Sequence, residues 1–151
     1  MATEIKRILL AEDNANDVEL TLTALRVNRL ANEVIVVRDG AEALDYLRRH
    51  GAYAGRAPGL PALMLLDLKM PKIDGLEVLR LVKEDPELRT LPVVVLTSSR
   101  EEQDLVRSYD LGVNAYVVKP VDFCAFTEAV KLLGGFWALL NEPPPASLKT
   151  S

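Results

Sequence analysis

Carboxylates, a hydroxyl and an ammonium directly follow four short apolar segments of this 151-residue sequence. These groups belong to Glu12, Asp13, Asp67, Thr97 and Lys119. A set of carboxylate oxygens suits a hard divalent cation such as Mg²⁺, which takes one or two carboxylates and completes its shell with water and phosphate oxygens. A lysine ammonium and a threonine hydroxyl can both donate hydrogen bonds to an anion. The residue types therefore predict a small anion-binding pocket beside a metal ion.

Five continuous apolar segments predict strands that are buried on both faces of a parallel sheet. They are Ile8–Ala11, Val34–Val37, Leu63–Leu66, Val93–Leu96 and Ala115–Val118. Their starts are 22 to 30 residues apart, close to the length of a βαβ unit. The intervening segments show helical periodicity, as in Val18, Leu22 and Leu25. We therefore predict an α/β fold, a doubly wound five-stranded parallel sheet with right-handed crossovers.

Sheets of this kind bind ligands at their carboxyl edge, where the strand order reverses. In the order 2-1-3-4-5 the first and third strands are neighbours, so Asp13 and Asp67 face each other across about one strand spacing, roughly 4.8 Å. Lys119 lies two strands from Asp67, about 10 Å in backbone terms, and only a long side chain crosses that gap. Thr97 lies on the strand between them, where its hydroxyl can donate to an oxygen above Asp67.

Each of these residues has a simpler explanation when it is considered alone. Asp13 or Asn14 could be the N-cap of the first helix, and Thr97 could make a local turn hydrogen bond. Lys119-Pro120 could be an ordinary turn. It is their conjunction at four strand ends that favours a site. The single cysteine, Cys124, has no such partners, and we expect it to pack among the aromatic residues of the last helix.

The predicted helices carry further expectations. Gly51 is placed to stop the helix that follows Asp39-Gly40, and Leu105, Val106 and Tyr109 should form the apolar stripe of the fourth helix. The last helix has a second apolar side, which predicts a partner surface or packing by the tail. We expect one folded domain over residues 1–140 and a disordered, proline-rich tail over residues 141–151.

Composition excludes several classes of function. Lys and Arg total 18 against 22 Asp and Glu, a net charge of −4 without long blocks of either sign, which argues against a nucleic-acid partner or a polybasic membrane patch. No segment approaches the roughly 18 to 20 apolar residues of a membrane span, and the first apolar run is too short for a signal peptide. One cysteine cannot form an intramolecular disulfide. We therefore expect a cytoplasmic protein.

Four motifs carry a family resemblance: EDN at 12–14, LLDLKMPKIDG around Asp67, VVVLTSS around Thr97 and AYVVKP up to Lys119 and Pro120. Over about residues 6–140 the sequence resembles receiver domains of two-component response regulators. The resemblance implies the CheY-like fold with strand order 2-1-3-4-5. It also implies that Asp67 accepts a phosphoryl group from a phosphohistidine of a sensor histidine kinase.

The resemblance implies a role for each site residue. Asp13, Asp67 and the carbonyl of Lys69 would bind Mg²⁺, and Glu12 would act through water. Lys119 would bind the phosphoryl oxygens, and its peptide bond to Pro120 would be cis. Thr97 would move towards the phosphoryl group while Tyr116 turns inward as the aromatic switch residue. Such a chain is a phosphoacceptor signalling protein that catalyses only its own phosphorylation and dephosphorylation, not a conventional enzyme.

The side chain of Lys69 offers no carboxamide or carboxylate to orient an attacking water, so we expect a rather stable phosphoryl group. A receiver-like module that binds partners without phosphorylation is the alternative. A phosphatase of the haloacid dehalogenase type would need an aspartate where Lys69 stands. A nucleotide or flavin binder would need a glycine-rich phosphate loop, and no GxGxxG or GxxxxGKS occurs.

A narrower resemblance is carried by the long connection at 49–62 with Tyr53, by DPELRTLPVVVLT and by SYDLGVNAY. These features, with Phe136-Trp137, look like the single-domain response regulators that work with bacterial phytochromes. The resemblance implies a bacteriophytochrome kinase as partner and a homodimer through the fourth helix, fifth strand and fifth helix. The implied contact residues are Tyr109, Tyr116, Phe136 and Trp137.

Overall fold

The computed structural model describes residues 6–27, 32–113 and 115–132. Its strands are β1 (Lys6–Ala11), β2 (Asn32–Val37), β3 (Leu63–Asp67), β4 (Val93–Thr97) and β5 (Ala115–Val118). Its helices are α1 (Ala15–Val27), α2 (Gly40–Arg48), α3 (Gly75–Glu84), α4 (Arg100–Ser108) and α5 (Phe123–Leu132), with a short 3-10 helix, η1, at Gly51–Tyr53. All five predicted strands are confirmed, and four of them are one or two residues longer than their apolar segments.

The strands form one parallel sheet in the order β2-β1-β3-β4-β5, which confirms the predicted α/β fold. In its register Ala11 pairs with Leu66, and Thr97 pairs with Val118. The carboxyl ends of β1, β3, β4 and β5 therefore lie along one edge of the sheet. The polar residues that follow these strands gather at that edge.

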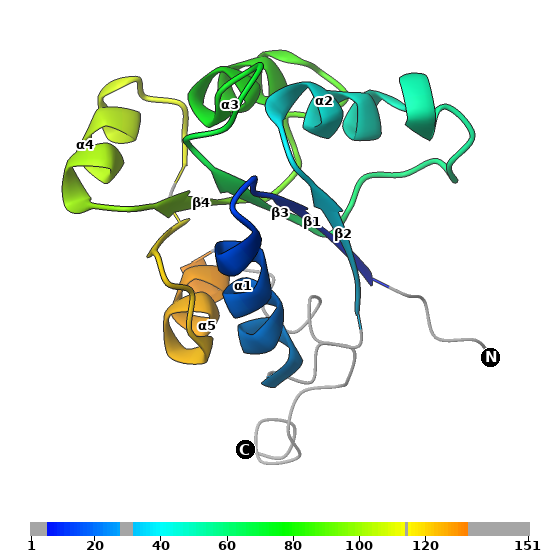
Figure 1. Ribbon diagram of the computed structural model, residues 1–151. Coiled ribbons are helices and arrows are strands. Elements are labelled where there is room, and N and C mark those ends of the chain that lie inside the picture. Colours follow the sequence, from blue (N-terminus) through cyan, green and yellow to red (C-terminus); the bar gives the residue numbers. More distant parts are fainter. Residues whose placement is uncertain (1–5, 28–31, 114, 133–151) are drawn as a thin grey trace, which may run out of the picture.

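Helices cover both faces of the sheet, as Figure 1 shows. The helices α1 and α5 lie on one face, where Val18, Leu25 and Phe126 pack against the sheet. The helices α2, α3 and α4 lie on the other face, where Leu44 and Leu79 belong to the second apolar cluster. Residues of β3 and β4 contribute to both clusters and every one of them is buried, because strands covered on both faces have no solvent side.

Three helices begin with the same capping arrangement. An Asp or Ser side chain accepts a hydrogen bond from the backbone N–H of a Glu three residues later, which satisfies one of the free donors at the helix N-terminus. The cap residues are Asp39, Asp74 and Ser99. These caps fix the loops that join the carboxyl ends of the strands to the helices, and so they shape the edge that carries the polar residues.

Some local expectations were wrong. Helix α2 ends at Arg48, and Arg49 rather than Gly51 stops it by taking the left-handed conformation, with φ 58°; Gly51 is also left-handed, with φ 57°, but it lies in η1. On α4 only Val106 is buried, while Leu105 and Tyr109 are 52% and 56% exposed, because the short helix turns one narrow stripe to the sheet. Cys124 is exposed instead of packed. The expected second apolar side of the last helix and the tail lie outside the described residues.

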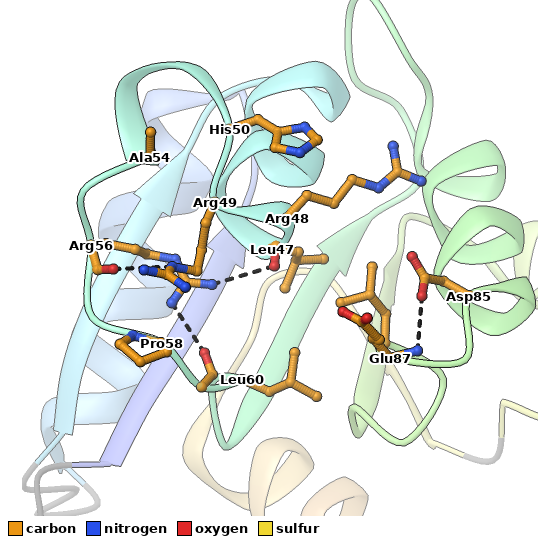
Figure 2. Close-up of a pocket in the computed structure, with 12 residues that line it drawn as sticks. Leu47, Arg48, Arg49, His50, Ala54, Arg56, Pro58, Leu60, Asp85 and Glu87 are labelled. Carbon is orange, nitrogen blue, oxygen red and sulfur yellow. Dashed lines mark hydrogen bonds between the residues drawn. The ribbon is translucent and has the colours of Figure 1, made fainter.

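The long connection between α2 and β3 is organised by Arg56 (Figure 2). Its guanidinium donates to the carbonyl oxygens of Tyr46, Leu47, Ala57 and Gly59 at 2.7 to 3.4 Å, and it stacks 4.2 Å from the centre of the Tyr46 ring. The connection lines an open groove of about 780 Å³. This groove lies at the amino ends of the strands, away from the polar edge.

Among the described residues, no helix is long and apolar enough to cross a membrane.

Candidate metal and anion site

Three carboxylates come together at the carboxyl edge of the sheet. Glu12 and Asp13 follow β1, Asp67 ends the neighbouring β3, and one oxygen of each lies within 4.8 Å of the others. Glu12 and Asp67 are buried and Asp13 is exposed, so the cluster opens to solvent on one side. The structure thus brings together the three acidic residues that the sequence predicted. An all-oxygen set of this kind fits a hard divalent cation.

Lys119 reaches this cluster from β5, on the far side of β4. Its Nζ lies 3.2 Å from Glu12 Oε1, 3.3 Å from Asp67 Oδ1 and 3.1 Å from Asp17 Oδ2. The Lys119 side chain is only 16% exposed, so these ion pairs are shielded from much of the solvent. The peptide bond between Lys119 and Pro120 is cis, as the resemblance implied.

The mutual proximity of these groups changes their affinity for protons. Burial and the negative charge of Asp67 raise the pKa of Glu12 to about 7. Burial alone would lower the pKa of Lys119, but its contacts with Asp17, Asp67 and Glu12 outweigh that effect and raise the pKa above its usual range. Lys119 is therefore charged at neutral pH. The Glu12 carboxylate takes up a proton near pH 7 unless a metal cation binds to it.

Thr97 ends β4, between Asp67 and Lys119. It is fully buried, and its hydroxyl has no hydrogen-bond partner among the described residues. Its carbonyl oxygen accepts a hydrogen bond of 2.8 Å from the Lys119 N–H. A buried hydroxyl without a partner is costly, so this donor is available to an anion at the sheet edge.

Lys69 follows Asp67 by two residues, and its exposed side chain points to α4. Its Nζ lies 3.0 Å from Glu102 Oε2. The other oxygen of Glu102 accepts a hydrogen bond of 2.8 Å from the backbone N–H of Ser98, directly after Thr97. Glu102 thereby links the loop after Asp67 to the loop after Thr97.

Two of the four aromatic residues named from the sequence are among the described residues, Tyr116 on β5 and Tyr109 directly after α4. Tyr116 is half-buried, and the guanidinium of Arg107 on α4 lies 4.9 Å from the centre of its ring. Tyr109 stands exposed at the end of α4. Phe136 and Trp137 lie outside the described residues.

The sequence alone did not identify Asp17 as part of the site. Asn14, not Asp13, caps α1, because the Asn14 side chain accepts a hydrogen bond of 2.9 Å from the Asp17 N–H. That cap places Asp17 in the first helical turn, facing Lys119. An acidic residue in the first turn of a helix is common for its interaction with the helix dipole, so nothing in the sequence set Asp17 apart.

Comparison with known proteins places this arrangement in a family. The model for the response regulator receiver domain matches residues 8–131. The chain is 62% identical to the bacteriophytochrome response regulator RtBRR, covering 97% of this chain and 88% of that one, with a TM-score of 0.87. It is 66% identical to the bacteriophytochrome response regulator AtBRR, covering 92% and 99%, with a TM-score of 0.88.

A third relative adds information about the metal. The response regulator Rcp1 of Synechocystis sp. is 40% identical over 132 residues, which cover 87% of this chain and 88% of Rcp1. A crystal structure of Rcp1 in its Mn²⁺-bound form matches with 39% identity over 93% of this chain and 99% of that one, at a TM-score of 0.71. The family match, these relatives and the acidic cluster agree. The chain belongs to the response regulator receiver family, whose members are phosphoacceptor signalling proteins and not conventional enzymes.

Proposed function

We propose that this chain is a response regulator that accepts a phosphoryl group on Asp67 from a phosphohistidine of a sensor histidine kinase. The observation that carries the proposal is the position of the Asp67 carboxylate, which is buried, lies beside two further carboxylates and is contacted by the ammonium of Lys119. Glu12, Asp13 and Asp67 provide oxygens for Mg²⁺, with the carbonyl of Lys69 as the further proposed ligand. The Mn²⁺-bound form of Rcp1 supports a divalent metal at this kind of site.

In the proposed reaction, a carboxylate oxygen of Asp67 forms a bond to phosphorus while the phosphorus–nitrogen bond of the phosphohistidine breaks. The imidazole leaves with the electron pair of that bond. Negative charge spreads over the three equatorial oxygens during such a transfer. Mg²⁺ held by Glu12, Asp13 and Asp67 would supply positive charge to these oxygens.

The other groups of the chain stabilise the same oxygens. Lys119 donates to them from the end of β5, and the hydroxyl of Thr97, which has no partner in the described part of the chain, gives a second donor from β4. The added phosphoryl group carries about −1.5 to −2 charges at neutral pH. We propose that this charge draws Thr97 towards the sheet edge and lets Tyr116 turn inward, which alters the surface that α4 and β5 present.

The phosphoacceptor role can be tested by intact mass measurement after incubation with acetyl phosphate and Mg²⁺. We expect one phosphoryl adduct that is absent in Asp67→Asn and absent with a chelator. Asp104→Asn, on the exposed part of α4, is the matched control and should keep the adduct. Failure of the folded wild-type protein to take up a phosphoryl group would favour a receiver-like module that works without phosphorylation.

Lys69 should favour a long-lived phosphoryl group. Its side chain pairs with Glu102 and offers no oxygen or amide to orient water against the phosphorus. Replacing Lys69 with Asn should shorten the lifetime of the adduct, which can be followed by mass after the phosphodonor is removed. Rapid loss from the wild-type protein, or an unchanged lifetime in the variant, would contradict this role.

The similarity to RtBRR and AtBRR favours a bacteriophytochrome as the kinase, which would meet this chain in the cytosol. Phosphoryl transfer from a purified bacteriophytochrome kinase should be much faster than transfer from an unrelated sensor histidine kinase, compared by kcat/KM. Equal rates would argue against this pairing.

A homodimer through α4, β5 and α5 is also part of the proposal. Leu105, Tyr109 and Val118 expose apolar surface on α4 and β5, at 52%, 56% and 49%. Leu105→Glu should shift the protein to monomers in sedimentation experiments. Leu60→Glu changes an exposed leucine far from this face and should leave the assembly unchanged. A monomeric wild-type protein, with and without phosphorylation, would refute the dimer.

A further inference from the structure

Asp17 lies outside the metal cluster, yet it is as close to Lys119 as the two carboxylates of the cluster are. The Lys119 Nζ lies 3.1 Å from Asp17 Oδ2, compared with 3.2 Å from Glu12 and 3.3 Å from Asp67. Asp17 belongs to α1, which covers one face of the sheet. Lys119 is therefore contacted by a residue of α1 as well as by residues at the sheet edge.

The three carboxylates match the full donor capacity of the ammonium. A lysine ammonium has three N–H groups, and Glu12, Asp17 and Asp67 each offer an oxygen within ion-pair distance. A phosphoryl oxygen lies two bonds beyond the Asp67 oxygen that binds phosphorus. The ammonium must therefore shift to reach it, and a contact with another carboxylate must lengthen.

Of these contacts, the one between Lys119 and Asp17 can be lost at the lowest cost in free energy. The Glu12 side chain is completely buried, so losing its cation would leave an uncompensated carboxylate away from water. The Asp17 side chain is 24% exposed, and water can solvate it after the ammonium has left. Its backbone N–H is held by Asn14 in either case, so α1 does not depend on this ion pair.

We propose that Asp17 is a positioning residue that restrains Lys119 in the unphosphorylated protein and slows phosphorylation of Asp67. The inference rests on the proposed phosphoacceptor function. Removing the Asp17 charge frees one donor of Lys119 for the phosphoryl oxygens. The contact between Asp17 and Lys119 stabilises the unphosphorylated protein. Part of its free energy is lost in the transition state, and this loss raises the activation barrier.

The test compares rates of Asp67 phosphorylation by acetyl phosphate at saturating Mg²⁺. Acetyl phosphate avoids the kinase, so contacts between α1 and a kinase cannot affect the result. Asp17→Asn should raise the maximal rate about two- to fivefold, the range expected from a partly exposed ion pair. Glu19→Gln removes the same charge from an exposed position on α1 and is the matched control. Asp17→Glu restores a carboxylate and should return the rate towards that of the wild type.

A general loss of negative charge can be separated from release of Lys119. Weaker repulsion of the anionic donor would lower its half-saturating concentration and would vanish at high salt, because salt screens interactions between exposed charges. Release of Lys119 raises the maximal rate and persists at high salt. Thermal unfolding of each variant shows that the compared proteins are folded.

Each result has a defined meaning. An increase in Asp17→Asn that exceeds that of Glu19→Gln and is reversed in Asp17→Glu supports the restraint. Equal rates in the two charge-removing variants, or a slower Asp17→Asn, overturn it while leaving the phosphoacceptor function intact. A wild-type protein that takes up no phosphoryl group at all overturns the proposed function and the restraint together.

Discussion

Replacing Lys119 with Met should destabilise the protein at alkaline pH and affect it much less at acidic pH. The substitution keeps the length of the side chain but removes the cation that lies 3.2 Å from Glu12 and 3.3 Å from Asp67. Removing one partner from a buried ion pair typically costs about 3 to 5 kcal/mol, because the other charge is left uncompensated. Glu12 limits this cost, since its pKa is already raised to about 7 and it can take up a proton.

We therefore expect a loss of about 2 to 3 kcal/mol in the free energy of unfolding at about pH 8. Without the ammonium, the pKa of Glu12 in the folded protein rises further, while in the unfolded chain it stays near its ordinary value. Between these two values the folded state binds the extra proton, so the stability of the variant increases as the pH falls to about 5.5. Mg²⁺ replaces the missing positive charge and should restore stability at about pH 8.

Urea unfolding at both pH values, with and without Mg²⁺, measures these changes. Lys83→Met is the matched control, because Lys83 is a partly buried lysine of α3 whose pKa is lowered by burial alone. Its replacement should be neutral or stabilising at both pH values. A loss in the Lys119 variant that is equal at both pH values and insensitive to Mg²⁺ would show that Lys119 acts by packing and not by charge.

Three further predictions concern other parts of the molecule. Mg²⁺ affinity should increase as the pH rises through about 7, because the proton on Glu12 must leave before the carboxylate can face a cation; calorimetric titrations that show a constant affinity would contradict this. Gly75→Ala should cost more than about 3 kcal/mol or prevent folding, because the new Cβ would lie 2.1 Å from the Asp67 carbonyl oxygen. Gly55→Ala, with nothing within 4 Å, should leave urea unfolding unchanged. Arg56→Met should raise hydrogen–deuterium exchange in the 49–62 connection without altering phosphorylation, and unchanged exchange would refute its organising role.

The sequence predicted the sheet and most of the site for the same physical reason. Strands buried on both faces must be continuously apolar, so their limits are visible in the sequence, and parallel strands must bring their carboxyl ends to one edge. The sequence therefore predicted that Asp13, Asp67, Thr97 and Lys119 lie together. The fold then follows from the spacing of the strands, because each gap holds one helix.

The features that sequence reasoning missed depend on helix phase and loop geometry. The contact of Asp17 with Lys119 requires the exact start of α1, which the Asn14 cap sets. Val106 points to the sheet and its neighbour Leu105 points to solvent. The short α4 has few apolar residues, so its sequence does not show which of the two faces inward. The left-handed Arg49 stands where glycine is usually expected, and its Nε donates a hydrogen bond to the Arg56 carbonyl oxygen across the loop.

The ion pairs of Lys119 also couple the site to the order in which the chain is made. Glu12 and Asp17 are 107 and 102 residues away from Lys119 in the sequence. During synthesis Glu12, Asp17 and Asp67 are added to the chain long before Lys119, whose ammonium contacts all three. Until β5 has been synthesised and has joined the edge of the sheet, the acidic cluster lacks its cation. A chain in which β5 has not yet joined the sheet therefore lacks the complete candidate site.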